Sequence, residues 1–79
     1  MSDRVTEAKW LRLRTTWNSF PPLAELPELE ELERTINESH QRAIEAIIAE
    51  NDPSTHWKSF GKAIKSFEDK FQEYKAYYL

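Results

Sequence analysis

Few side chains in this 79-residue sequence could carry out chemistry on a substrate. The chain has two histidines, one glycine and no cysteine. The lack of cysteine excludes disulfides, a thiolate nucleophile and cysteine-bound zinc, and one glycine cannot build a phosphate-binding loop. His40 falls on the apolar face of one predicted helix, and His56 falls in the first turn of another. We therefore expect no enzyme activity, no cofactor and no metal site.

Aromatic residues near the C-terminus form the first candidate site, because their type suits the binding of another protein. Tyrosine and tryptophan bury a large area while keeping one polar contact, so they are common at interface centres. Two interpretations are open: a core aromatic layer, or a surface that docks another chain. Tyr77 lies to the side of the main apolar stripe, so we expect its ring to point outward. The candidate residues are Phe71, Tyr74, Tyr77, Tyr78 and Trp17.

A second candidate is an acidic cluster at the start of the predicted second helix. Helix dipoles favour carboxylates there, so one interpretation is a solvated first turn that Arg12 and Arg14 partly neutralise. The functional interpretation is a docking patch for a basic surface, including a surface that otherwise holds nucleic acid. The cluster consists of Glu25, Glu28, Glu30, Glu31 and Glu33.

The third candidate is a possible basic ridge formed by Lys58, Lys62 and Lys65. It is either a solvated outer face or a phosphate-binding surface, and the net charge of −3 argues against a nucleic-acid footprint. Gly61 lies in the same segment, where glycine costs about 1 kcal/mol relative to alanine within a helix. Either this glycine lets the first helix approach closely, or it leaves a shallow notch for a partner side chain.

Helices must position these residues. From Trp57 onward, large apolar residues recur at alternating spacings of three and four, which is the pattern of one stripe along one helix. Proline residues and the short segment 51–54 separate three such patterns, and so short a connection folds the third helix back along the second. The sequence predicts an all-α, antiparallel three-helix bundle in a single domain, 1–79. Its helices cover about 3–18, 27–50 and 53–77, and the second and third form a long hairpin.

Three local features follow from this arrangement. Asn51 is suited to the left-handed conformation that ends the second helix, and Asp52 can cap the third helix with Pro53 at its first position. The segment from Ala43 to Ala49 is apolar almost all round, so we expect other helices to cover it on two sides. An exposed aromatic surface, if the protein has one, is then expected between Phe71 and Tyr78.

These observations favour a non-catalytic protein-binding module. It would either self-associate as a homo-oligomer or act as a small adaptor or inhibitor of a larger assembly. The alternative is an acidic inhibitor that occupies a nucleic-acid-binding site on a partner, and a third hypothesis is direct nucleic-acid binding through the helix 3 lysines. No apolar run approaches the ~18 residues that span a bilayer, and no export signal is evident. We therefore expect a cytoplasmic protein that does not associate with membranes.

Overall fold

The computed structural model describes residues 4–78 and the side chains of residues 4–77. It confirms the all-α prediction, since the described residues form helices and connections and contain no strand. The helices are α1 (Arg4–Asn18), α2 (Pro21–Ala24), α3 (Pro27–Ile48) and α4 (Ser54–Tyr78). The short α2 is an additional turn of helix between the first two predicted elements. The predicted start of the first helix at residue 3 lies outside the described residues.

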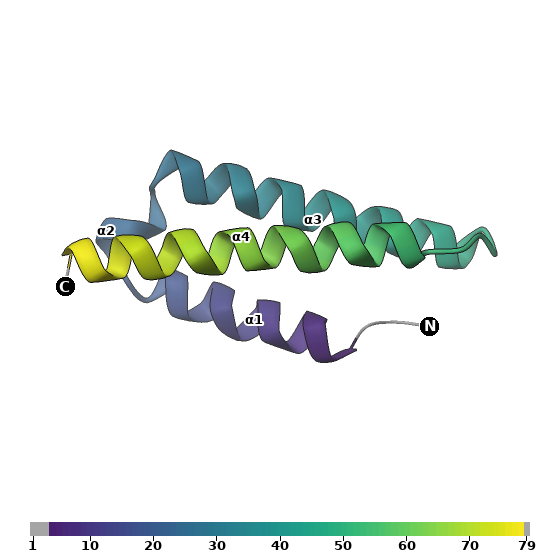
Figure 1. Ribbon diagram of the computed structural model, residues 1–79, viewed down its shortest axis with the longest axis horizontal. Coiled ribbons are helices and arrows are strands. Elements are labelled where there is room, and N and C mark those ends of the chain that lie inside the picture. Colours follow the sequence, from purple (N-terminus) through teal and green to yellow (C-terminus); the bar gives the residue numbers. More distant parts are fainter. Residues whose placement is uncertain (1–3, 79) are drawn as a thin grey trace.

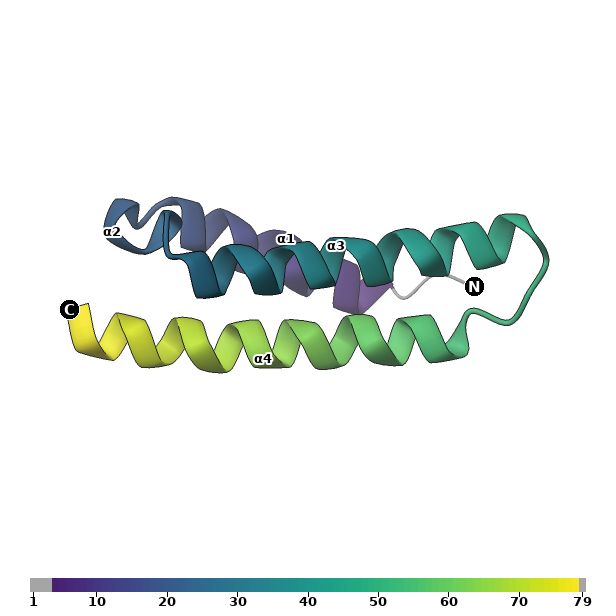
Figure 2. The ribbon, with the colours of Figure 1, turned by 90° about the horizontal axis from the view of Figure 1, so that it is seen from above.

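α4 is the central element of the bundle. It runs between α3 and α1 in Figure 1, and Figure 2 shows that α3 and α1 both lie on the same side of it. The predicted hairpin is confirmed, because α3 and α4 run antiparallel along most of their lengths. Among the described residues, no Cα atom of α1 comes within 8 Å of a Cα atom of α3. The hairpin is therefore the scaffold, and α1 packs onto it mainly through α4.

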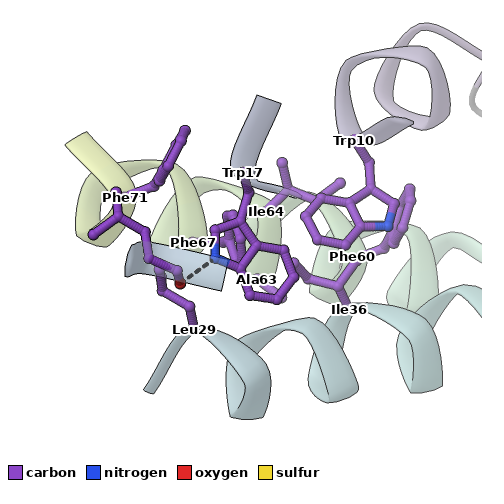
Figure 3. Close-up of a cluster of buried hydrophobic side chains, with 10 residues drawn as sticks. Trp10, Trp17, Leu29, Ile36, Phe60, Ala63, Ile64, Phe67 and Phe71 are labelled. Atoms are coloured by element: carbon purple, nitrogen blue, oxygen red, sulfur yellow. Dashed lines mark hydrogen bonds between the residues drawn. The ribbon is translucent and has the colours of Figure 1, made fainter. Parts of the chain in front are cut away.

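The core forms around the apolar stripe of α4. Phe60, Ile64, Phe67 and Phe71 are at most 1% exposed. In Figure 3 the indoles of α1 lie over this stripe, and the Trp10 ring meets the Phe67 ring edge-to-face with centroids 5.1 Å apart. Such an edge-to-face pair adds about 0.5–1.5 kcal/mol to the stability from buried area. The remaining buried apolar residues are Trp17, Leu23, Leu29, Ile36, Ala43, Ala46 and Ala63.

A buried hydrogen bond holds α2 against the end of α1. The indole Nε1 of Trp17 donates to the backbone oxygen of Leu23 at 2.7 Å (Figure 3). Trp17 is 3% exposed and Leu23 is 1% exposed, so water cannot replace either partner. A buried polar group without a partner is costly, and this contact satisfies both groups at once. It fixes the direction in which the chain turns toward α3.

The connection between α3 and α4 corrects one prediction. The residue in the left-handed conformation is Glu50, with φ 60°, and not Asn51. The N–H of Asn51 donates to the Ala46 oxygen at 2.8 Å, and the N–H of Glu50 donates to the Ile47 oxygen at 3.1 Å. These two bonds define a Schellman motif, in which the left-handed residue directly follows the C-cap. Because α3 stops at Ile48 and its cap is Ala49, that position falls on Glu50.

Asp52 lies just before α4 and holds its first turn. One carboxylate oxygen accepts hydrogen bonds from the Ser54 hydroxyl at 2.6 Å and from the Ser54 N–H at 3.0 Å. These bonds favour the charged form and lower the pKa of Asp52 below its ordinary value. The predicted role of Asp52 at the helix start is confirmed, although the helix begins at Ser54, one residue later than predicted.

The prediction for the C-terminal half of α3 was wrong. Ala43 and Ala46 are buried, but Ile48 is 77% exposed and Ile44 and Ile47 are only partly buried. α1 is shorter than the hairpin and does not reach its closed end, so no other helix of the described chain covers this part of α3 on its second side. None of the helices in the described chain is long and apolar enough to cross a lipid bilayer.

Candidate interaction surfaces

The structure separates the predicted aromatic site into core and surface residues. Trp17 and Phe71 belong to the core, so their rings are not available to a partner. Tyr74 is partly buried, and its hydroxyl donates to Glu28 at 2.6 Å. Tyr77 is 82% exposed, which confirms that its ring points outward. The Tyr78 side chain lies outside the described residues, and partner binding at this end stays a prediction.

The acidic cluster is partly engaged in contacts within the chain. Glu33 pairs with Arg14 at 3.1 Å, and Glu28 lies 3.8 Å from Lys70 as well as accepting from Tyr74. In the described part of the chain, its other three members form no ion pair and are exposed: Glu25, Glu30 and Glu31. The free acidic surface is thus smaller than the sequence suggested.

The three lysines of the basic ridge are all exposed on α4. Lys65 forms an i,i+4 pair with Asp69 at 2.9 Å, and this carboxylate raises the pKa of Lys65. Within residues 4–78, neither Lys58 nor Lys62 forms an ion pair. Both ammonium groups are exposed, and, after the Ser54 hydrogen bonds, the charge of Lys58 contributes to the lowered pKa of Asp52.

Gly61 lies beside the basic ridge, and its surroundings decide between its two interpretations. A Cβ atom added there would meet no atom within 4 Å, apart from its chain neighbours and the backbone of its own helix. This excludes the first interpretation, in which Gly61 lets the first helix approach closely. A shallow, open hollow lies over this part of α4, and all of its lining residues belong to that helix: Thr55, Trp57, Lys58, Ser59, Gly61 and Lys62.

Sequence reasoning missed an apolar surface at the end where α3 ends and α4 begins. We call it the hairpin-end surface, and it consists of Ile44, Ile47 and Ile48 of α3 and Trp57 of α4. Ile48 is exposed and the other three are partly buried. Ile44 and Ile48 are four residues apart, so they share a face of α3, and this spacing was the available signal. That spacing does not predict how long α1 is or how it tilts, and these determine whether the described part of α1 covers this face of α3.

His40 contacts side chains of α1 and α4 and so has a role in packing the helices together. Its Nε2 lies 2.9 Å from a Glu7 carboxylate oxygen, which links α3 to α1. Its ring also packs against Phe60 and Trp57, with centroid distances of 5.2 and 5.8 Å. No group of three metal-binding side chains comes together anywhere in the described residues. His40 therefore serves to join the three helices near the hairpin end.

Comparisons with known proteins add no further evidence. No family model matches the chain, and no curated protein or solved structure is significantly similar to it.

Proposed function

We propose that this protein is a non-catalytic protein-binding module that uses its hairpin-end surface to hold its partner. The observation that carries this proposal is the exposure of Ile48, 77%, on the same face of α3 as the partly buried Ile44. Contiguous apolar surface on a small protein is typical of an interaction site. Burying it would remove apolar area from water at roughly 25 cal/mol per Å² before the costs of association.

The shape of the bundle supports this choice over the aromatic C-terminal end. At that end, α2 and Phe20 cover the stripe, and Lys75 lies 5.6 Å from the centres of the Phe20 and Phe71 rings. Tyr77 is the one described member of the predicted aromatic site that is fully exposed there. At the hairpin end, Ile48 of α3 is exposed, and no other helix of the described chain covers it. The partner is either a different protein or a second copy of the chain.

The test compares capture of binding partners by the natural chain and by two matched variants. Ile48→Lys places a charge in the hairpin-end surface, and Leu11→Lys places the same charge at another exposed apolar position, on α1. We expect Ile48→Lys to lose a specific binding partner that Leu11→Lys retains. Equal capture by both variants would contradict the proposal. Light scattering on the purified chain shows whether that partner is a second copy.

A second candidate function is supported by three exposed acids that form no ion pair with the residues the structure describes: Glu25, Glu30 and Glu31. In this function the protein occupies a basic, nucleic-acid-binding site on its partner. Reversing these three charges to lysine would then abolish partner binding, and binding would weaken with added salt. Capture that survives the triple reversal excludes this candidate.

A further inference from the structure

The hollow beside Gly61 combines an open space over a helical glycine with exposed lysine side chains on the same helix. Glycine within a helix costs about 1 kcal/mol relative to alanine. Here no neighbouring atom requires its small size, because a Cβ would meet nothing within 4 Å. As far as the described residues are concerned, the space above Gly61 is therefore open to an atom of another molecule.

The surroundings of this glycine indicate what chemistry fits. On a helix, residues three and four positions away are surface neighbours, so Trp57, Lys58 and Lys65 border Gly61, and Lys62 follows it directly. Trp57 and Gly61 supply an apolar floor, while the lysines supply a basic rim. Lys58 and Lys62 form no ion pair within residues 4–78. The rim is thus complementary to negative charge, and the floor to a large apolar side chain.

We propose that the Gly61 notch docks an acidic segment of a partner protein, with one bulky apolar side chain over Gly61 and carboxylates on Lys58 and Lys62. This inference rests on the proposed function, and it names the chemistry of the partner. Trp57 connects the two regions, because it lies in the hairpin-end surface and also lines the hollow. An acidic protein segment suits the site better than nucleic acid, because this site has only two lysines without an ion pair in the described chain, and the net charge is −3.

The test uses a fluorescein-labelled peptide in which one phenylalanine is flanked on each side by four glutamates. A matched peptide carries glutamine in place of glutamate. We expect fluorescence anisotropy to show binding of the glutamate peptide and at least about tenfold weaker binding of the glutamine peptide. Equal affinity for the two peptides, or binding of neither, would overturn the inference.

Three variants locate the binding. Lys58→Glu/Lys62→Glu should weaken the affinity for the glutamate peptide by about tenfold or more. The control, Arg34→Glu/Arg42→Glu, makes the same change in net charge on α3 and should have only a small effect on this affinity. Gly61→Leu fills the notch and should also weaken binding by about tenfold, while raising thermal stability, so that unfolding cannot explain the loss. Equal effects of the two double variants, or unchanged affinity with Gly61→Leu, would contradict the assignment.

Two further probes separate the ligand classes. Anionic phosphatidylserine vesicles and a single-stranded RNA oligonucleotide should bind more weakly than the glutamate peptide, and tighter binding of either would refute an acidic protein segment. The inference and the proposed function can fail separately. A native partner that is lost with Ile48→Lys but kept with Lys58→Glu/Lys62→Glu and Gly61→Leu leaves the function in place and removes the notch.

Discussion

Replacing Gly61 with alanine should make the protein more stable, although the substitution lies within the longest helix. Gly61 is seven residues beyond the first residue of α4, about two turns from its start. Alanine is favoured over glycine in a helix interior by about 0.8–1.0 kcal/mol, chiefly because glycine loses more backbone entropy on folding. The added methyl group meets no atom within 4 Å, so no packing penalty offsets this gain. We expect a net stabilisation of about 1 kcal/mol.

Urea unfolding followed by circular dichroism measures this effect. The transition midpoint should rise while its slope stays constant, because the surface exposed on unfolding hardly changes. In thermal unfolding the same free energy corresponds to about 4–8 °C for a domain of this size. Ser66→Ala, at an exposed position of the same helix, is a suitable control and should give a smaller increase. A loss of stability in Gly61→Ala would show that the space over the glycine is filled, and would refute the reasoning about an open notch.

Three further predictions concern the parts that shape the bundle. Glu50→Gly should stabilise the protein by about 0.5–1 kcal/mol in urea unfolding, because a left-handed residue at φ 60° suits glycine; a destabilised variant would contradict the Schellman assignment. Trp17→Phe should destabilise by about 1–3 kcal/mol, because it leaves the buried Leu23 oxygen without its donor, and an unchanged midpoint would show that water reaches this oxygen. Asp52 has a lowered pKa in the folded state, so its contribution is present at neutral pH and is lost as the pH falls below its ordinary value of 3.8 through the folded pKa. The stability difference between the natural chain and Asp52→Ala should therefore shrink toward pH 2, and a constant difference would contradict the hydrogen bonds to Ser54.

Much of the fold could be predicted because helix periodicity and helix ends depend on residues close together in the sequence. The stripe from Trp57 to Tyr78 follows from spacing alone, and its central residues, Phe60 to Phe71, are buried in the core, whereas Trp57 and Tyr74 are partly buried. The connection after α3 was also predictable in position, because Pro53 and Asp52 interrupt the pattern. The left-handed residue was misplaced because the motif counts from the last helical residue, and α3 stops at Ile48 rather than Glu50. The C-cap is Ala49, so the left-handed position after it falls on Glu50 and not on Asn51.

The candidate surfaces were less predictable, because exposure depends on how the helices reach across one another. Phe71 and Tyr77 both belong to the aromatic end in sequence, yet one is 1% and the other 82% exposed. Ile48 was expected to be covered, but the described part of α1 stops short of the hairpin end and does not reach it. Spacing defines which face of a helix is apolar, whereas the length, tilt and separation of its neighbours decide whether that face is buried. The space over Gly61 depends on tertiary structure in the same way.

Site-specific photo-crosslinking tests the central claim most directly. A photoreactive phenylalanine analogue placed at Ile48 reports contacts of the hairpin-end surface, and the same analogue at Leu11 reports another exposed apolar position. The proposed function predicts a discrete crosslinked protein from position 48, in the native host, that is absent or much weaker from position 11. Crosslinks from position 11 alone, or from neither position, would contradict binding through the hairpin end.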